Sequence, residues 1–310
     1  MTKSASEIIK ENYRFTNAEL DRFIATCPFR YKVYQISKKN STEKRTIAHP
    51  SRVLKAVQRT LLSSILDDLL AVHDCAKAYK KGTGIKANAS IHLQNNFLLK
   101  MDFKNFFPSI TSDDFEKLLR EKYDVTDTYD LNILKQVFFM KVRENLVLSI
   151  GSPGSPLISN SMLFNFDETM NEVSRNNGVI YSRYSDDLTF STSTPEVLTG
   201  WPKQITKILD DLVYPRLTVN VDKTVHTSKR HNRHVTGVTL SSEGKLSIGR
   251  EKKRIIRAKI HQVNKLNPNE IRQLRGHLAF LAHIEPDTYR VLSIKYKNEF
   301  RLIGSALNRD

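Results

Sequence analysis

The chain has 310 residues, of which 39% are hydrophobic and 26% are charged, so it is long enough for two or three domains and is neither a disordered nor a fibrous protein. Its 49 lysines and arginines exceed its 33 aspartates and glutamates, which gives a net charge of +16, and residues 223–301 alone hold 18 basic and 6 acidic residues, a net +12. This concentrated positive charge indicates a polyanionic partner, either nucleic acid or an acidic membrane surface.

Two cysteines, Cys27 and Cys75, are too few for a zinc site. The chain shows no secretory leader pattern, so we expect both thiols to be reduced and the protein to be cytoplasmic. No apolar run approaches the roughly 18 residues that a membrane helix needs, and we expect no membrane partner.

Hydrophobic periodicity predicts a helix-rich start, a mixed centre and a helical, basic end. Four-residue spacing of apolar side chains predicts an amphipathic helix, and two-residue alternation predicts a strand. The predicted elements, in chain order, are a helix over 51–72 capped by Ser51, a strand over 97–103, a helix over 156–173, a hairpin of strands 179–183 and 188–191, short strands near 217–221 and 235–240, and helices after Arg250.

Three aspartates stand where these elements end or turn. Asp102 follows a hydrophobic strand, and Asp186 and Asp187 lie at the tip of the predicted hairpin. Adjacent side chains diverge on a straight strand, so both carboxylates can serve one site only where the chain turns. Carboxylates side by side repel each other unless a positive charge offsets the repulsion, and Mg²⁺ is usually held by one or two carboxylates. The residues therefore indicate a divalent-cation site; the alternative is a solvated turn.

Several short segments, in a fixed order, resemble the palm motifs of reverse transcriptases. They are Met101–Ser109, Gly151–Pro156 with Ser159 and Asn160, Tyr184–Asp187 and Leu217–Thr224, and upstream of them Lys44–Ile47 with Pro50 and Leu54–Lys55 resembles the fingers motif of bacterial members. The resemblance spans roughly residues 30–240. It implies an α+β, right-hand polymerase fold: N-terminal helices and fingers (1–96), a palm of antiparallel sheet plus helices that carries the catalytic aspartates (97–235), and a basic helical thumb (236–310).

Within that family the chain is most similar to retron reverse transcriptases. Asn88–His92 matches an Asn-Ala-x-x-His element between fingers and palm, and Val235–Gly237 matches a Val-Thr-Gly element near the thumb. Each also has an ordinary structural interpretation, a helical turn with a hydrogen-bonded histidine and a strand bulge at Gly237. The resemblance implies an RNA-directed DNA polymerase that copies part of its own structured noncoding RNA from a 2′-hydroxyl of an internal guanosine. Its product would be branched multicopy single-stranded DNA (msDNA), made for antiphage defence with an accessory effector protein.

The resemblance also implies roles for individual residues at the active site. Asp102 and Asp186 would bridge two Mg²⁺ ions, or Mn²⁺ ions, with Asp187 as a neighbouring partner and the Phe103 backbone carbonyl as a further ligand. Phe107, five positions after the first aspartate, would be the aromatic wall that excludes a ribose 2′-hydroxyl.

Further residues would bind the incoming nucleotide (dNTP). Lys223 corresponds to a family lysine near the pyrophosphate. Arg45 can bind phosphate with its planar guanidinium, and Lys38 or Lys39 would add charge from the same loop. Gly151 allows close backbone approach. Ile150 stands where related enzymes usually have glutamine, so we expect the polarity of the nucleotide pocket or the fidelity to differ.

The basic C-terminal quarter is predicted to act as a thumb that holds template–primer and structured RNA, with an affinity that falls as salt is added. The residues predicted to contact nucleic acid are Asn88, His92, Lys229, Arg230, Arg233, Val235, Thr236, Gly237, Lys253 and Arg257. Two other functions stay open from the sequence: a nucleic-acid-binding scaffold that restrains a toxic effector, and a reverse transcriptase like those of group II introns.

Overall fold

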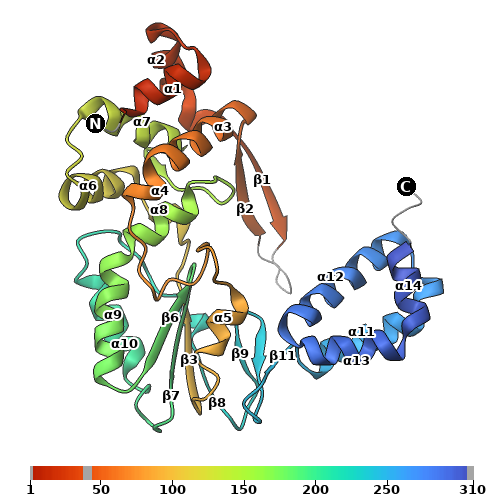
Figure 1. Ribbon diagram of the computed structural model, residues 1–310. Coiled ribbons are helices and arrows are strands. Elements are labelled where there is room, and N and C mark those ends of the chain that lie inside the picture. The colour runs from red at the N-terminus through yellow and green to blue at the C-terminus, as the bar shows by residue number, and fades with distance from the viewer. Residues whose placement is uncertain (1–2, 38–43, 306–310) are drawn as a thin grey trace.

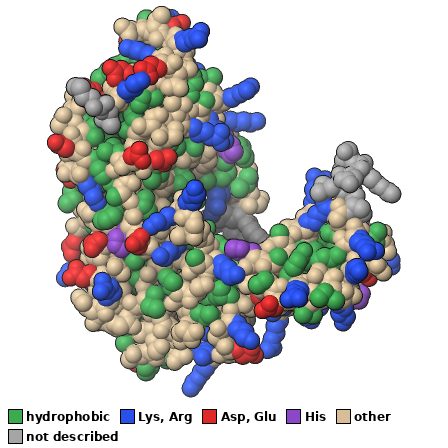
Figure 2. Space-filling view, viewed as in Figure 1, with side chains coloured by type: hydrophobic (Ala, Val, Ile, Leu, Met, Phe, Trp, Pro, Cys, Tyr) green, Lys and Arg blue, Asp and Glu red, His purple; other side chains and the backbone are tan. Residues whose placement is uncertain are grey.

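The computed structural model describes residues 3–37 and 44–305, which form an N-terminal lobe, a central antiparallel sheet with helices on its faces, and a C-terminal helical lobe (Figure 1). The predicted α+β class is confirmed by these separate helical and antiparallel parts. The C-terminal lobe projects from the body, and a wide hollow lies between it and the N-terminal lobe (Figure 2). Among the described residues, no helix has the length and apolar character needed to span a membrane.

Capped helices from two separate stretches of the chain build the N-terminal lobe. The helices α1 (Ala5–Tyr13) and α2 (Asn17–Thr26) each begin with a capping box, in which a hydroxyl and a glutamate satisfy the free backbone amides. The helix α7 (Thr128–Phe138) packs against both, and the Asp130 carboxylate accepts hydrogen bonds from the amides of Ala5 and Ser6. The other elements of this lobe are η1 (Cys27–Phe29), β1 (Tyr31–Ser37), β2 (Lys44–Pro50), α6 (Ser112–Tyr123), β4 (Met140–Val142) and β5 (Asn145–Val147).

The helix predicted over 51–72 begins as predicted but is not regular throughout. The Ser51 hydroxyl accepts a hydrogen bond from the Leu54 amide and caps α3 (Arg52–Leu61). A π-helical segment, η2 (Leu62–Leu66), then separates α3 from α4 (Asp67–Leu69). The buried side chains of Leu54, Leu61 and Leu66 keep facing the core through this change of pitch.

Within the described residues, the central sheet has four antiparallel strands in the order β6-β7-β3-β8. They are β3 (Phe97–Asp102), β6 (Ile180–Tyr184), β7 (Asp187–Thr192) and β8 (Val225–Ser228), and the helices α9 (Phe164–Asn176) and α10 (Trp201–Asp210) cover one face (Figure 1). Alternation along β3 places Leu99 and Met101 against these helices and Leu98 in a second core. That second core joins the opposite face, through α5 (Ile85–Ser90), to the C-terminal lobe.

Two predicted elements differ in the structure, and one strand was not predicted. The helix predicted over 156–173 is two helices, α8 (Ser155–Met162) and α9, because the chain leaves helical geometry at Leu163. The strand predicted near 217–221 is reduced to an isolated bridge between Val219 and Phe103, and the short helix η4 (Val221–Lys223) follows it. The sheet edge is taken by β8, which the hydrophobic pattern did not predict.

The strand predicted near 235–240 is divided by a tight turn. Thr236 and Gly237 both have positive φ, +47° and +80°, and this left-handed pair reverses the chain between β9 (Arg233–Val235) and β10 (Val238–Leu240). Gly237 is therefore a turn residue, not a strand bulge. The strand β11 (Leu246–Ser247) completes this small sheet.

The helices predicted after Arg250 form the C-terminal lobe. Asn267 caps the longest of them with a capping box, and Leu274, Leu278 and Leu281 of that helix are buried. The elements are α11 (Arg250–His261), η5 (Val263–Lys265), α12 (Pro268–Ile284), α13 (Pro286–Lys295) and α14 (Lys297–Ser305). The division of the chain at 96/97 and 235/236 stays a prediction, since packing crosses both positions.

Candidate active site

Strand register brings the three predicted carboxylates to one end of the central sheet. Asp102 of β3 lies directly opposite Asp187 of β7, and both point away from the helix-covered face, where Met101 and Leu188 are buried. Ser185 and Asp186 form the turn between β6 and β7, with Ser185 at φ +61°. The Phe103 amide donates a hydrogen bond of 3.1 Å to the Asp186 carbonyl, so the turn is tied to the end of β3.

Burial and the charges of neighbouring carboxylates raise the pKa values of Asp186 and Asp187. Removal from water raises the pKa of Asp186, and the negative charge of Asp102 raises it further. The same removal from water, with the charges of Asp186 and Asp102, raises the pKa of Asp187 to about 6. The Lys223 ammonium donates a 2.5 Å hydrogen bond to Asp102 Oδ2, and this bond raises the pKa of Lys223. The site therefore attracts positive charge.

The donor set fits a hard divalent cation. No group of three or more His, Cys, Asp or Glu side chains is arranged as a metal site within the part of the chain that the structure describes. The chemistry of the three carboxylates still matches the oxygen ligands that Mg²⁺ takes, and their mutual repulsion is the charge that a cation offsets. In this conformation Lys223 supplies part of that positive charge.

A fully buried ion pair lies beneath the turn, and sequence reasoning missed it. Arg183 and Asp167 are both inaccessible to solvent, and their closest approach, Nη2 to Oδ2, is 2.6 Å. Arg183 Nη1 also donates to the Ser185 carbonyl at 3.1 Å and to Asn160 Oδ1 at 3.0 Å. The available signal was an arginine in phase with Tyr181 on the apolar face of a strand, where a charge requires a buried partner.

The residues predicted to bind the nucleotide lie around this sheet end. Arg45 is exposed on β2, and its positive charge acts to lower the pKa of Asp186. Phe106 is core, stacked on Phe103, whereas Phe107 is half-buried beside it.

Gly151 lies against β2, and the two predicted lysines are not among the described residues. A Cβ on Gly151 would lie 2.9 Å from the Ala48 carbonyl oxygen, so its close backbone approach is to β2. Lys38 and Lys39 lie outside the described residues.

Comparison with known proteins decides what kind of site this is. Residues 36–240 match the family model described as reverse transcriptase (RNA-dependent DNA polymerase). The retron Ec83 reverse transcriptase of Escherichia coli is 43% identical over 273 residues, which cover 86% of each chain. The chain belongs to the retron reverse transcriptases. It is an RNA-directed DNA polymerase, and this membership favours the retron type over a group II intron enzyme.

A second curated relative is also a retron reverse transcriptase, and one solved structure has a distant similarity. The retron Ec86 reverse transcriptase of Escherichia coli is 34% identical over 286 residues, covering 90% of this chain and 84% of the relative. Among solved structures, apo telomerase from Candida tropicalis, truncated from its C-terminal domain, aligns with a TM-score of 0.47 and 12% identity over 70% of this chain and 54% of the telomerase chain.

The Asn-Ala-x-x-His element of this retron reverse transcriptase is buried, which corrects the predicted nucleic-acid contact of Asn88 and His92. Both side chains are inaccessible to solvent. His92 Nδ1 lies 2.7 Å from the Ser191 hydroxyl and His92 Nε2 lies 2.8 Å from the Ser182 hydroxyl. His92 therefore fastens the segment after α5 to β6 and β7, which is the ordinary structural interpretation that the sequence left open.

Arg233 and Val235 are likewise buried, and the same correction applies to them. Arg233 donates to the carbonyls of Asn95 and Ser241, so its guanidinium joins β9 to two neighbouring loops. The turn after Val235 is accessible: Thr236 and Gly237 line a pocket of about 330 Å³ together with Asp102, Asp187 and Lys223. The Thr236 hydroxyl also donates to the Ile85 carbonyl.

The other predicted contacts are basic residues at the surface. Lys229 and Arg230 are exposed, and with Lys253 they line a groove of about 1130 Å³ between the β8–β9 connection and the C-terminal lobe. Lys253 already forms an ion pair within the protein, since its ammonium lies 2.7 Å from Glu285 Oε2. Arg257 is exposed on α11.

We expect Asp167→Asn to lower the free energy of unfolding by about 3–5 kcal/mol, because it leaves the Arg183 charge buried without its partner. Urea or thermal unfolding measures the loss. Asp113→Asn is the matched control: Asp113 pairs with Lys135 at 2.8 Å but is exposed, so the same change should cost only about 0–1 kcal/mol. Equal losses in the two variants would contradict the special weight of the buried pair.

Stability should also depend on pH through His92, because burial lowers the pKa of this imidazole to about 3. The unfolded chain binds the proton near pH 6.5 and the folded chain does not, so the contribution of His92 is complete above about pH 6.5 and is lost as pH falls toward 3. Between pH 7 and pH 5, urea unfolding of the wild type should lose about 2 kcal/mol more than that of His92→Gln. His226→Gln, at an exposed histidine, should keep the wild-type pH dependence; an identical slope in all three proteins would refute the assignment.

Proposed function

We propose that this retron reverse transcriptase copies part of a structured noncoding RNA encoded beside it into msDNA, starting from a 2′-hydroxyl of an internal guanosine. The observation that carries the proposal is the register of β3 and β7, which sets Asp102 opposite Asp187 and next to the Asp186 turn. Three carboxylates at one sheet end form a site for nucleotidyl transfer in a chain 43% identical to a retron reverse transcriptase. The product would act in antiphage defence with an accessory effector protein.

The lobes correspond, in this proposal, to the parts of a right-hand polymerase. The fingers would span residues 1–96 and include the β1–β2 hairpin, the palm would span 97–235 and include the central sheet, and the thumb would span 236–310 and include the C-terminal lobe. Within the palm range, α6, α7, β4 and β5 pack with the fingers in the N-terminal lobe. The hollow between the N-terminal and C-terminal lobes would hold the RNA–DNA hybrid (Figure 2). The net charge of +12 over residues 223–301 favours this placement, since an electrostatic grip needs cations along the phosphate backbone.

Asp102 and Asp186 would hold two Mg²⁺ ions, or Mn²⁺ ions, with Asp187 and the Phe103 carbonyl beside them. Bound there, the ions would activate the attacking hydroxyl and stabilise the departing pyrophosphate. Lys223 would supply charge or a proton to that pyrophosphate.

The chain's own side chains would orient the nucleotide around that site. Arg45, with Lys38 or Lys39, would bind the triphosphate. Phe107 would wall off a ribose 2′-hydroxyl, and Gly151 would keep the backbone close to the pocket.

Template–primer and the cognate RNA would contact the exposed members of the predicted set. These are Lys229, Arg230 and Arg257, the ion-paired Lys253, and the turn at Thr236 and Gly237. The buried members, Asn88, His92, Arg233 and Val235, would act from beneath by holding these surfaces in place. Support for this division comes from the pocket that the turn shares with Asp102 and Asp187.

Asp186→Ala should abolish DNA synthesis while leaving RNA binding within about twofold of the wild type, because one carboxylate is removed from the metal site and no basic residue changes. Primer extension and a mobility-shift assay on the purified proteins measure the two properties. Asp210→Ala, at an exposed aspartate of α10, is the control and should extend normally. Normal extension by Asp186→Ala would remove this residue from the active site.

The same pair of proteins tests the msDNA proposal in cells. RNase-treated nucleic acid from cells that express the chain with its upstream DNA should contain a short, discrete DNA joined to RNA by a 2′ branch, and the Asp186→Ala cells should lack it. A wild-type enzyme that extends primers in vitro but yields no such DNA would leave the polymerase in place and reject the retron product.

Phe107→Ala should weaken the discrimination against ribonucleotides by about 10-fold or more, since one hydrophobic contact at a pocket wall is worth about 1–3 kcal/mol. The ratio of kcat/KM for a deoxyribonucleotide and its ribonucleotide measures the discrimination. Phe106→Leu is the comparison, because Phe106 is buried in the core and should affect stability more than sugar choice. Unchanged discrimination in Phe107→Ala would place the gate elsewhere.

A further inference from the structure

A segment that precedes the central sheet in the chain runs beside the catalytic turn. Ala76 forms a parallel bridge with Arg183 of β6. The Arg183 amide donates to the Cys75 carbonyl at 2.8 Å, and the Lys77 amide donates to the Arg183 carbonyl at 2.7 Å. Because the two segments are parallel, both run toward the turn, and the residues after Lys77 come level with Ser185 and Asp186. The residue that reaches the turn is Tyr79.

Tyr79 has a strained backbone that its neighbours hold in place. Its φ is +62°, in the left-handed region, which glycine adopts freely and asparagine and aspartate tolerate, but which is an outlier for a bulky side chain. Asn160 Nδ2 donates to the carbonyl of Ala78 at 3.0 Å on one side, and the Thr83 hydroxyl donates to the Lys80 carbonyl at 2.8 Å on the other. Strain that the surroundings over-determine in this way gathers at functional sites.

The Tyr79 side chain does not account for the strain by packing. The residue is 56% exposed, and in the described chain it belongs to neither hydrophobic core. Its hydroxyl donates a 3.2 Å hydrogen bond to the Ser185 hydroxyl, in the turn that carries Asp186. A tyrosine is thus held with its tip on the catalytic turn and much of its ring open to solvent.

The end of the growing strand must come to this place. In the proposed function, the reacting hydroxyl would lie within about 3–3.5 Å of the phosphate that it attacks, and that phosphate would lie beside the carboxylates of Asp102 and Asp186. The terminal nucleotide would therefore lie over the Ser185–Asp186 turn, on which the Tyr79 hydroxyl also rests. Exposed aromatic rings in nucleic-acid channels contact bases and sugars through their faces, in a way that tolerates any sequence.

We propose that Tyr79 is a substrate-contacting residue whose ring packs against the terminal base pair of the RNA–DNA hybrid and positions the growing end over the carboxylates. The proposal rests on the assignment of Asp102 and Asp186 as the catalytic centre. The hydroxyl bond to Ser185 orients the ring, and the ring makes the contact. Tyr79 thereby couples the position of the hybrid to the position of the turn that carries Asp186.

Tyr79→Gly separates this role from a structural one, because glycine relieves the left-handed strain while it removes the ring. We expect the thermal unfolding midpoint to stay equal or rise, while KM for template–primer rises about 10-fold and KM for the dNTP stays within twofold. Tyr79→Phe keeps the ring and should hold KM for template–primer within threefold of the wild type. Tyr79→Asn, which also tolerates positive φ, is the second ring-less variant and should behave as Tyr79→Gly does.

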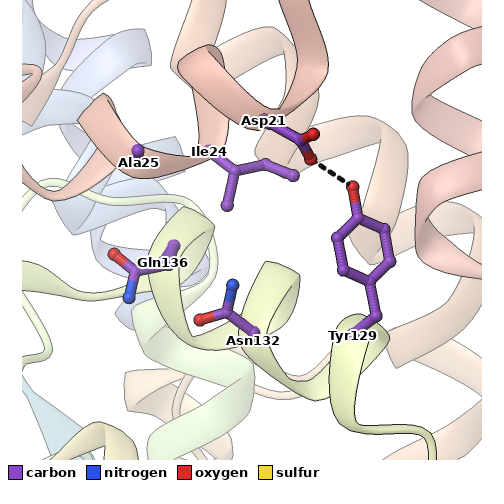
Figure 3. A pocket seen from close by; sticks show the side chains of 6 residues that line it. All are labelled: Asp21, Ile24, Ala25, Tyr129, Asn132 and Gln136. Atoms are coloured by element: carbon purple, nitrogen blue, oxygen red, sulfur yellow. Dashed lines mark hydrogen bonds between the residues drawn. The ribbon is translucent and has the colours of Figure 1, made fainter. Parts of the chain in front are cut away.

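The matched control is Tyr129, a second exposed tyrosine whose hydroxyl bonds a side chain. It lies in α7, lines a surface pocket together with Asp21 of α2, and donates to Asp21 Oδ1 at 2.7 Å (Figure 3). Tyr129→Gly should lower the unfolding midpoint, because glycine is unfavourable in a helix, and leave KM for template–primer unchanged.

The kinetic outcomes decide the proposal. If both ring-less variants keep KM for template–primer within twofold of the wild type, the ring makes no contact and the inference is overturned. If Tyr79→Phe is as defective as Tyr79→Gly, the hydroxyl bond to Ser185 carries the effect and the ring contact is also rejected. Both results leave the Asp186→Ala outcome untouched, so a failure here is distinguishable from a failure of the proposed active site.

Discussion

The end of the central sheet that carries the three aspartates depends on one buried guanidinium. Arg183 binds the Asp167 carboxylate on one side and the Ser185 carbonyl on the other, and no part of the pair reaches solvent. Burying two charges costs free energy, and a pair of apolar side chains in the same place would not carry this cost. The buried pair is therefore better explained by the backbone geometry that it holds than by a gain in stability. Here the geometry is that of a two-residue turn with Ser185 in the left-handed region, one position before Asp186.

Repulsion among carboxylates and the positive charge that answers it organise the surroundings of this turn. Removal from water and the charge of Asp102 raise the pKa of Asp186, and removal from water with the charges of Asp186 and Asp102 raises the pKa of Asp187. Lys223 is bound to Asp102 at 2.5 Å. Arg45 lies on β2, and its positive charge acts to lower the pKa of Asp186, as that of Lys223 does. The three carboxylates would repel an anion at this end of the sheet, and bound cations would remove that repulsion. This property suits a site for a metal-bound triphosphate.

Support from beneath links this site to the C-terminal lobe. His92 joins the segment after α5 to β6 and β7, and Arg233 joins β9 to the loop that follows His92. The accessible turn at Thr236 and Gly237 stands on this buried layer and shares a pocket with the carboxylates. The two segments that resemble retron elements, Asn88–His92 and Val235–Gly237, therefore lie close together. Their buried residues hold the exposed turn in place.

Local pattern in the sequence was enough for the elements and the chemistry of the site. Strand alternation located β3, a turn was required between β6 and β7 for Asp186 and Asp187 to act together, and the Ser51 cap and the helices after Arg250 follow from local rules. Motif order alone indicated the family. The elements depend on neighbours within a few positions, and the motifs depend only on their order along the chain, so the sequence alone contains both.

Tertiary structure alone decided which residues are buried and which meet. From the sequence, the histidine of Asn-Ala-x-x-His could contact RNA or lie in the core. The structure decides for the core, because serines of β6 and β7 bond both of its ring nitrogens. The pairing of Asp167 with Arg183 could not be predicted, because one residue lies in a helix and the other in a strand. Hydrophobic periodicity does not show how those two elements pack together. Tyr79 becomes notable only through its φ and through Ser185, over a hundred residues away. Contacts between distant segments depend on how whole elements pack, and no local spacing encodes that packing.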